Sequence, residues 1–408
     1  MKTLPFVAIL ISLFCVSPVL AHEEHEHGDA KHSPEKMWAD ILAKDQTLAT
    51  SVAFDAQGRL WRASVRDRHV LVDYSDDLGK TFAAPAALNP EAEAIGADGD
   101  SRPKIAIGKH GEVYVSWTKL LDKPYTGDVR FSRSLDGGRT FSAPITVNDN
   151  RDVIGHRFDA LTVSADGKVY LAWLDKRDLA AAKSKGEKYS GSALYYAVSD
   201  NSGKSFAANV KLVDYSCDCC RIALAAPPHG APVAFWRHVF DDNIRDHALA
   251  RLDGRNEIHR VSHDEWKIEA CPHHGPALSI ASDGVYHLSW FDNAPKARGL
   301  FYAQSRDGGQ TFSTPLHFGE DTRQAGHADV LSMGQNVLLV WKEFDGKVSS
   351  IQLMRSNDGG ASWTDPSSVA DTSDASDHPQ LAIHDGHAWL SWNTKLEGYR
   401  LIALKDVP

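Results

Sequence analysis

Short segments rich in β-branched and aromatic residues recur along the chain, each after a turn that contains glycine. Residues 111–117 (GEVYVSW) and 167–173 (GKVYLAW) each contain a short turn followed by a β-rich segment that ends in tryptophan. Such segments predict short β-strands. A related segment begins at Gly58 with Ser64 in the tryptophan position, and tryptophan recurs at Trp236, Trp290, Trp341 and Trp392. The pattern predicts seven units of about 50–60 residues, each long enough for four short strands.

A turn with the pattern Ser-x-Asp-x-Gly-x-Thr-aromatic follows most of these units. Its copies are Ser75–Phe82, Ser134–Phe141, Ser305–Phe312, Ser356–Trp363 and, in relaxed form, Ser199–Phe206. Serine and aspartate side chains bond turn amides, glycine takes a conformation that other residues resist, and the aromatic ring fills the core. The unit around Trp236 lacks the turn, which accounts for the doubled spacing between Asn201 and Asp307.

These turns resemble the Asp-box, or BNR, repeat of sialidase-like β-propellers, and the resemblance covers most of the chain. It implies an all-β fold, a single propeller of the sialidase superfamily type with seven four-stranded blades over residues 37–408. Six blades, as in the sialidases themselves, are the alternative if the end units merge. Residues 37–50 are expected to supply a closing strand to the last blade, and the polar insertion 179–190 to form a loop in the third unit.

The N-terminus predicts an exported protein. Residues 1–21 combine a short basic start, an apolar run and a final small residue, Ala21, as in a signal peptide. Residues 22–36 form a His-rich, acidic segment before the propeller. We therefore expect a periplasmic or secreted protein with no membrane span after cleavage; retention of the apolar run as an anchor is the alternative.

The composition disfavours some classes of binding partner. The 408 residues carry a net charge of -10, which disfavours nucleic acid or an anionic membrane as the main partner. Histidine is in excess, with 20 residues. No nucleotide-binding glycine loop is present, so no nucleotide cofactor is expected.

Ligand sites of propellers are normally built from the loops that lead into the innermost strand of each blade. Three arginines fall at such entrances, and a cluster of guanidinium groups suits a carboxylate sugar: Arg102, Arg157 and Arg221. The sialidase resemblance implies an arginine triad, an aspartic acid catalyst, here Asp159 or Asp100, and a Tyr–Glu pair, here Tyr399 and Glu397. The Arg-Ile-Pro signature of sialidases is absent before the first Asp box. Structural arginines that bond loop carbonyls are the alternative.

A second set at the entrances consists of histidines and cysteines. Its members are His156, Cys219, Cys220, His274, His327 and His378. The propeller would direct them towards one axis, and imidazole with thiolate favours copper or zinc.

Four cysteines remain after signal cleavage: Cys217, Cys219, Cys220 and Cys271. In an oxidising compartment they could form two disulfides, or they could be metal ligands together or after one disulfide. The Cys-x-Cys-Cys stretch and the Cys-Pro-x-x-Gly-Pro stretch resemble those of a set of exported sialidase-like propellers, which implies a specialised subfamily without supplying an activity.

Histidines also cluster in the exported segment, at His22, His25 and His27. A free α-amine beside the imidazole of His22 would favour Cu(II); an acidic linker with incidental histidines is the alternative. The sequence thus predicts a non-catalytic metal-binding propeller, with copper favoured over zinc. The alternatives are a sialidase-type hydrolase or carbohydrate-binding propeller for a small acidic sugar, and an assembly propeller for another exported protein.

Overall fold

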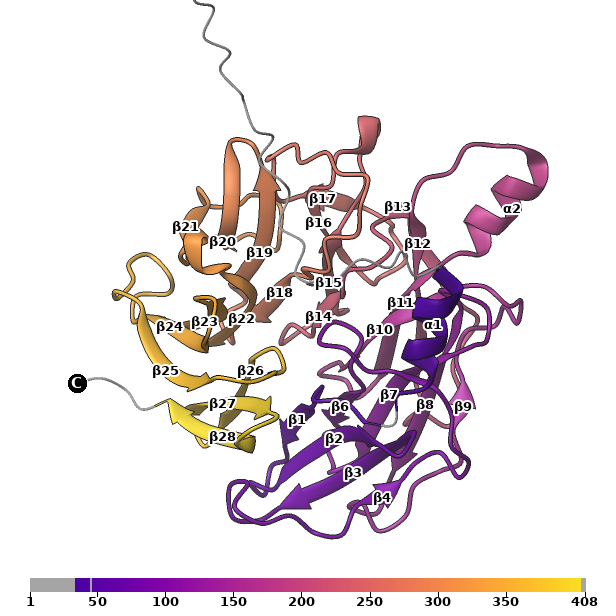
Figure 1. Ribbon diagram of the computed structural model, residues 1–408, viewed down its shortest axis with the longest axis horizontal. Helices are drawn as coiled ribbons and strands as arrows, with labels where there is room; N and C mark the ends of the chain where they lie inside the picture. Colours follow the sequence, from indigo (N-terminus) through magenta and orange to yellow (C-terminus); the bar gives the residue numbers. More distant parts are fainter. Residues whose placement is uncertain (1–33, 45, 405–408) are drawn as a thin grey trace, which may run out of the picture.

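The computed structural model describes residues 34–44 and 46–404, and they form a ring of seven antiparallel β-sheets (Figure 1). Seven blades are therefore confirmed, and the six-blade alternative is wrong. The predicted signal peptide and the arm histidines His22, His25 and His27 lie outside the described residues. Within the described part of the chain, no helix is long and apolar enough to cross a bilayer.

The first four blades run in chain order around the ring. Blade 1 contains β1 (Ser51–Phe54), β2 (Leu60–Arg66), β3 (His69–Ser75) and β4 (Ala86–Ala87). Blade 2 contains β5 (Ile95–Gly96), β6 (Lys104–Ile107), β7 (Val113–Leu120), β8 (Gly127–Ser134) and β9 (Ile145–Thr146). Blade 3 contains β10 (His156–Val163), β11 (Val169–Asp175), β12 (Ser192–Ser199) and β13 (Val210–Ser216). Blade 4 contains β14 (Ala223–Ala225), β15 (Val233–Arg237), β16 (His247–Arg251) and β17 (Ile258–Arg260).

The last three blades complete the ring. Blade 5 contains β18 (Ala277–Ile280), β19 (Tyr286–Ala294), β20 (Ala297–Ser305) and β21 (Leu316–Phe318). Blade 6 contains β22 (Gly326–Met333), β23 (Asn336–Phe344), β24 (Ser349–Ser356) and β25 (Ser367–Thr372). Blade 7 contains β26 (Gln380–His384), β27 (His387–Thr394) and β28 (Gly398–Leu404). Short 3-10 turns lie at Asp241–Asn243 and Asp321–Arg323.

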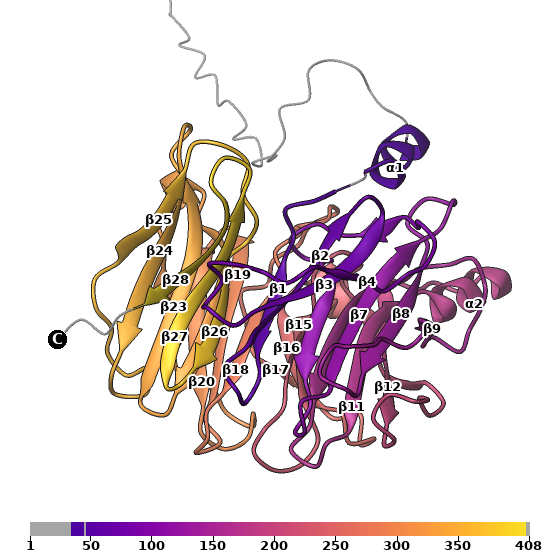
Figure 2. The same cartoon turned by 90° about the horizontal axis from the view of Figure 1, so that it is seen from below.

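The expectation of a closing strand from residues 37–50 is wrong for the described residues. This segment forms helix α1 (Pro34–Leu42) and an irregular stretch, and α1 lies over one face of the ring (Figure 2). Trp38 anchors the helix because its indole donates to the carbonyl of Leu121 at 2.8 Å. The ring closes instead through apolar packing of Val52 and Leu60 against Ala382 of blade 7, and through a hydrogen bond from the Thr50 amide, just before β1, to Asp377 Oδ2 at 3.0 Å.

The insertion expected to be a loop contains helix α2 (Arg177–Lys185), which projects from the rim (Figure 1). Alanines at 180–182 favour the helix. Gly186 ends it with φ of 71°, a left-handed conformation that glycine adopts without strain.

The repeated tryptophans form the buried centre of the blades. All six are at most 1% exposed: Trp117, Trp173, Trp236, Trp290, Trp341 and Trp392. Their indole groups bring a polar atom into the core, and most donate it to a nearby acceptor, as Trp341 does to Glu343 at 2.8 Å. The sequence repeat thus marks the layer where neighbouring sheets pack.

The Asp-box turns share one hydrogen-bond geometry between the third and fourth strand of a blade. In the first, Ser75 Oγ donates to Asp77 Oδ1 at 2.7 Å, and the Thr81 amide and hydroxyl donate to the same carboxylate at 2.8 and 2.7 Å. The bonds from Thr81 and Ser75 lower the pKa of Asp77 to about 2. These turns lie on the outside of the blades, so they support the architecture and carry no ligand chemistry.

The two glycines of the second Asp box offer a matched test of packing between blades 1 and 2. Gly137 and Gly138 have φ of 70° and 79°, so alanine is strained at both. A Cβ on Gly137 meets no atom within 4 Å, whereas one on Gly138 would overlap the ring of Trp61. We expect Gly137→Ala to lower the free energy of unfolding by about 1 kcal/mol and Gly138→Ala by about 2–4 kcal/mol. Equal losses in urea unfolding would contradict the packing argument.

Candidate metal centre at the channel mouth

The entrance loops of the blades meet at one end of the channel. Arg221, which precedes β14 of blade 4, shows this most directly. Its Nη1 lies 3.1 Å from Asp100 Oδ1 of blade 2, its Nε donates to Pro276 O of blade 5, and its Nη2 donates to Ala328 O of blade 6. One side chain therefore joins four blades, and the channel mouth is a packed polar cluster.

A group of three buried thiols lies in the loop before β14. Cys217 Sγ is 3.9 Å from Cys219 Sγ and 3.8 Å from Cys220 Sγ. All three side chains are at most 5% exposed and pack with apolar residues of blades 3 and 4, such as Phe158 and Trp236. Metal–sulfur bonds of about 2.3 Å place neighbouring sulfurs about 3.8 Å apart in a tetrahedral site and about 4.0 Å apart in a trigonal one. The two spacings from Cys217 are close to both values, and Cys219 and Cys220 lie within 4.8 Å of each other.

A second pair of donors extends this thiol cluster towards solvent. Cys219, Cys271 and His273 offer ligand atoms that all lie within 4.8 Å of one another. Cys271 and His273 are exposed and belong to the loop before β18. Cys219 is shared by both groups, so the buried thiols are continuous with an exposed pair of donors on the neighbouring blade.

The three buried thiols differ in the direction in which their surroundings shift the pKa. Hydrogen bonds from the thiols of Cys219 and Cys220 lower the pKa of Cys217, and the positive charges of Arg237 and Arg245 act in the same direction. Arg245 Nη1 donates to Cys217 Sγ at 3.4 Å. The same contacts raise the pKa values of Cys219 and Cys220, since these thiols act as donors. Among the described residues no two cysteines are joined by a disulfide bond.

The arginines at the entrances have different surroundings. Arg102 donates to Gly99 O, Thr50 O and Asp377 Oδ1 at 2.8–2.9 Å, so its guanidinium group is occupied by the loops that close the ring. Arg157 lies over Trp38 and Phe158, with 5.3 and 5.0 Å between its Cζ and the ring centroids, and burial lowers its pKa. Arg102 and Arg221 are thus bonded to carbonyls and aspartates, whereas Arg157 packs on aromatic rings.

The other residues suggested by the sialidase resemblance are dispersed. Asp159 accepts hydrogen bonds from Ser116 Oγ at 2.6 Å and Thr118 Oγ1 at 3.0 Å, so both of its oxygens are bonded within the blades. Glu397 lies in the turn after β27 and accepts from a threonine hydroxyl. Tyr399 is on β28, the third strand of its blade, and packs edge-on against Phe82 of blade 1. The Tyr–Glu pair is thus away from the innermost strands.

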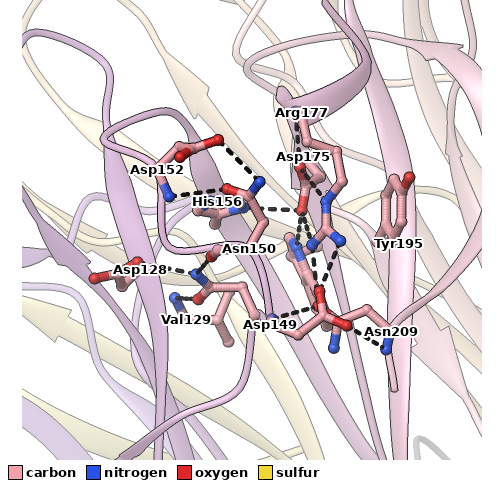
Figure 3. Close-up of polar contacts among 12 residues, drawn as sticks. Asp128, Val129, Asp149, Asn150, Asp152, His156, Asp175, Arg177, Tyr195 and Asn209 are labelled. Atoms are coloured by element: carbon pink, nitrogen blue, oxygen red, sulfur yellow. Dashed lines mark hydrogen bonds and ion pairs between the residues drawn. The ribbon is translucent and has the colours of Figure 1, made fainter. Parts of the chain in front are cut away.

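His156 belongs to a separate network in blade 3, shown in Figure 3. Its Nδ1 lies 2.8 Å from Asp175 Oδ2, which also accepts from the indole of Trp173 at 2.8 Å and from Arg177 Nη2 at 2.9 Å. Arg177 continues to Asp149 Oδ1 at 2.7 Å. The sequence placed His156 with the metal ligands, but the structure does not bring it together with the thiols or the other entrance histidines.

The remaining entrance histidines form a stack beside the thiol cluster. The ring centroids of His274 and His327 are 4.4 Å apart, and those of His327 and His378 are 3.5 Å apart. Burial lowers the pKa values of His327 and His378 well below the ordinary range. Asp100, His327 and His378 offer ligand atoms within 4.8 Å of one another. The single set predicted from sequence is therefore divided into a thiol group and an imidazole–carboxylate group.

Two residues of the mouth were missed by the sequence reasoning. Burial lowers the pKa of Lys104 to about 8, and its Nζ donates to Arg102 O at 2.6 Å. Its position two residues after an entrance arginine was the available signal. In the Cys-Pro-His-His stretch, the sequence predicts His274 as a ligand, whereas the structure places the adjacent His273 beside Cys219 and Cys271.

Comparison with known proteins supports the fold. No family model matches the chain, and no curated protein matches it. Among solved structures, the polysaccharide lyase Uly1 is 11% identical over 95% of this chain and 94% of its own, with a TM-score of 0.55. An ulvan lyase of polysaccharide lyase family PL25 is 11% identical over 89% and 92%, with a TM-score of 0.54. The Hadza microbial sialidase Hz136 is 15% identical over 85% and 76%, with a TM-score of 0.48. At these identities, the two lyases share with this chain the fold alone.

Proposed function

We propose that this protein is an exported copper-binding propeller whose thiol cluster, Cys217, Cys219 and Cys220, holds Cu(I). The observation that carries the proposal is the pair of sulfur–sulfur distances of 3.9 and 3.8 Å among three buried thiols. Thiolates are soft ligands that select Cu(I) and zinc over harder ions. The buried set has three members, and its fourth neighbour, Cys271, is exposed. A structural zinc site uses four closed ligands, so the buried set suits Cu(I) better.

The role that fits this chemistry is copper handling or tolerance outside the cytoplasm. A His-rich arm with His22, His25 and His27 would collect ions. The exposed donors Cys271 and His273 lie between solvent and the buried thiols, which provides a route for exchange. Disulfide formation between two of these cysteines would compete with copper binding, because it would remove two thiolate ligands.

A sialidase-type hydrolase receives less support from the site. The donors of Arg102 and Arg221 are bonded to backbone carbonyls and aspartates, and Tyr399 is remote from the innermost strands. Release of sialic acid from a fluorogenic sialoside, lost in Arg221→Ala, would support that alternative.

The test is Cu(I) binding by the full mature chain with the arm histidines replaced by alanine. Under anaerobic, reducing conditions and in competition with a Cu(I) chelator, we expect one equivalent to bind at sub-micromolar free copper. A Cys219→Ser/Cys220→Ser variant is expected to lose it. Ser216→Ala is the matched control, since Ser216 is buried beside the loop and its Oγ has no hydrogen-bond partner. Equal Cu(I) binding by parent and double variant would overturn the proposal.

A further inference from the structure

A column of stacked rings crosses three blades next to the thiol cluster. Phe291, His274, His327 and His378 follow one another with centroid distances of 4.1, 4.4 and 3.5 Å and interplanar angles of 20°, 15° and 16°. The column ends at Asp100 of blade 2, whose Oδ1 is 3.9 Å from His378 Nδ1. Loops from blades 2, 5, 6 and 7 thus build one compact group of nitrogen and oxygen donors.

The backbone around the column leaves space for these rings. A Cβ on Gly99 would overlap the ring of His378, and a Cβ on Gly326 would lie 2.8 Å from His274 Cε1. Neither glycine has the positive φ that would require glycine for conformational reasons. Close approach of the imidazoles is therefore the reason why larger residues do not fit at these two positions.

Two ring nitrogens at the end of the column lack hydrogen-bond partners. The Nδ1 atoms of His327 and His378 are buried and make no hydrogen bond. His327 is 6% exposed and Asp100 is 3% exposed. Buried polar atoms are normally paired, because an unpaired one costs about 1–3 kcal/mol. Two unpaired imidazole nitrogens beside a carboxylate indicate a site for a ligand that accepts lone pairs.

We propose that Asp100, His327 and His378 form a second metal site, which takes a borderline divalent first-row cation. Two imidazoles and one carboxylate are a recurrent donor set for such ions, and Cu²⁺ binds this kind of set most tightly. The proposal goes beyond the thiol cluster and shares no residue with it. Binding requires the rings of His327 and His378 to turn out of their parallel stack, since the in-plane lone pairs of parallel rings do not converge.

Positive side chains near this site compete with a bound cation. Arg221 Nη1 lies 3.1 Å from Asp100 Oδ1, and Arg102 and Lys342 are further cations near the two histidines. Asp377 compensates Arg102 through an ion pair at 2.9 Å. A dication at Asp100 would compete with Arg221 for the carboxylate, so binding is expected to loosen the contact between blades 2 and 4.

The test uses Cu²⁺ as the probe in the full mature chain with the arm histidines replaced by alanine and with Cys219→Ser/Cys220→Ser. Under oxidising conditions we expect one equivalent of Cu²⁺ and an electron paramagnetic resonance spectrum with hyperfine coupling to two imidazole nitrogens. His327→Gln/His378→Gln is expected to lower the affinity by about 100-fold or more. His259→Gln, a partly exposed histidine on β17, is the matched control and should bind like the parent.

Two results would overturn the second site. One is a parent spectrum with one coupled nitrogen or none, and this measurement does not depend on the folding of any histidine variant. The other is unchanged affinity in a His327→Gln/His378→Gln variant that melts cooperatively. Since Cys219 and Cys220 are replaced in this background, failure of Cu(I) binding in the earlier experiment and failure of Cu²⁺ binding here are separate outcomes.

Discussion

Replacing Cys217 with serine is expected to lower the Cu(I) affinity by about 100-fold or more, and replacing Cys271 by about 10-fold or less. Cys217 contacts both other buried thiols, whereas Cys271 is exposed and joins the cluster only through Cys219. Structural sites with four ligands contribute about 10–16 kcal/mol, so the loss of one thiolate costs on the order of 3 kcal/mol. Competition titrations of the two single variants against the same chelator measure the ranking.

The Cys271→Ser variant serves as the control for this ranking, since it removes one thiol from the same mouth. Equal losses in both variants would indicate a four-ligand site and favour zinc over copper. A larger loss in Cys271→Ser than in Cys217→Ser would place the ion at the exposed pair and contradict the buried site.

Replacing Asp175 with alanine is expected to lower the free energy of unfolding by about 3–5 kcal/mol. Asp175 is fully buried and accepts from His156, Trp173 and Arg177, so its removal leaves the first two donors without an acceptor and leaves Arg177 with fewer partners. Asp149 is the matched control, because it bonds the same Arg177 from a half-exposed position. Asp149→Ala should cost about 1 kcal/mol or less. Urea unfolding at neutral pH measures both.

The same carboxylate predicts how stability depends on pH. Burial alone would raise the pKa of Asp175, but hydrogen bonds from His156 and Arg177 outweigh it and lower the pKa to about 2. A carboxyl group with a lower pKa in the folded chain stabilises it above the unfolded value, near 4, and this contribution of about 2 kcal/mol is lost as the pH falls through 2. The acid-induced loss between pH 4 and 2 should therefore be smaller in Asp175→Ala. An identical acid profile in both proteins would contradict this assignment.

The parts of the fold that depend on local repeats could be predicted from the sequence. Each Asp box is closed by bonds within eight residues, and each strand tryptophan marks its own blade, so the blade number followed. The structure of residues 34–50 could not be predicted, because α1 depends on the docking of Trp38 against a loop of blade 2. The predicted closing strand in residues 37–50 was wrong because the sequence does not show this docking.

The sequence predicted that the candidate site lies at the blade entrances, but not which of the entrance residues lie together. Counting back from each tryptophan located the entrance residues, yet the direction of each side chain depends on partners distant in sequence. His156 is held by Asp175 in its own blade, whereas His378 meets Asp100 across the ring closure. The sialidase resemblance makes Asp100 a candidate acid catalyst. The sequence alone does not show which blade entrances face each other, so it could not place Asp100 beside His378.

The closure of the ring has a consequence for how the protein would respond to its ligands. In the described chain no fourth strand joins blade 7 to blade 1. The seam between them is held by an apolar cluster and by the loops that carry Thr50, Arg102, Asp377 and His378. Loops that hold an ion are therefore also the loops that keep the first and last blades together. An ion that binds there binds only the folded ring and therefore stabilises it. The copper-bound protein is expected to resist heat and proteolysis better than the copper-free protein.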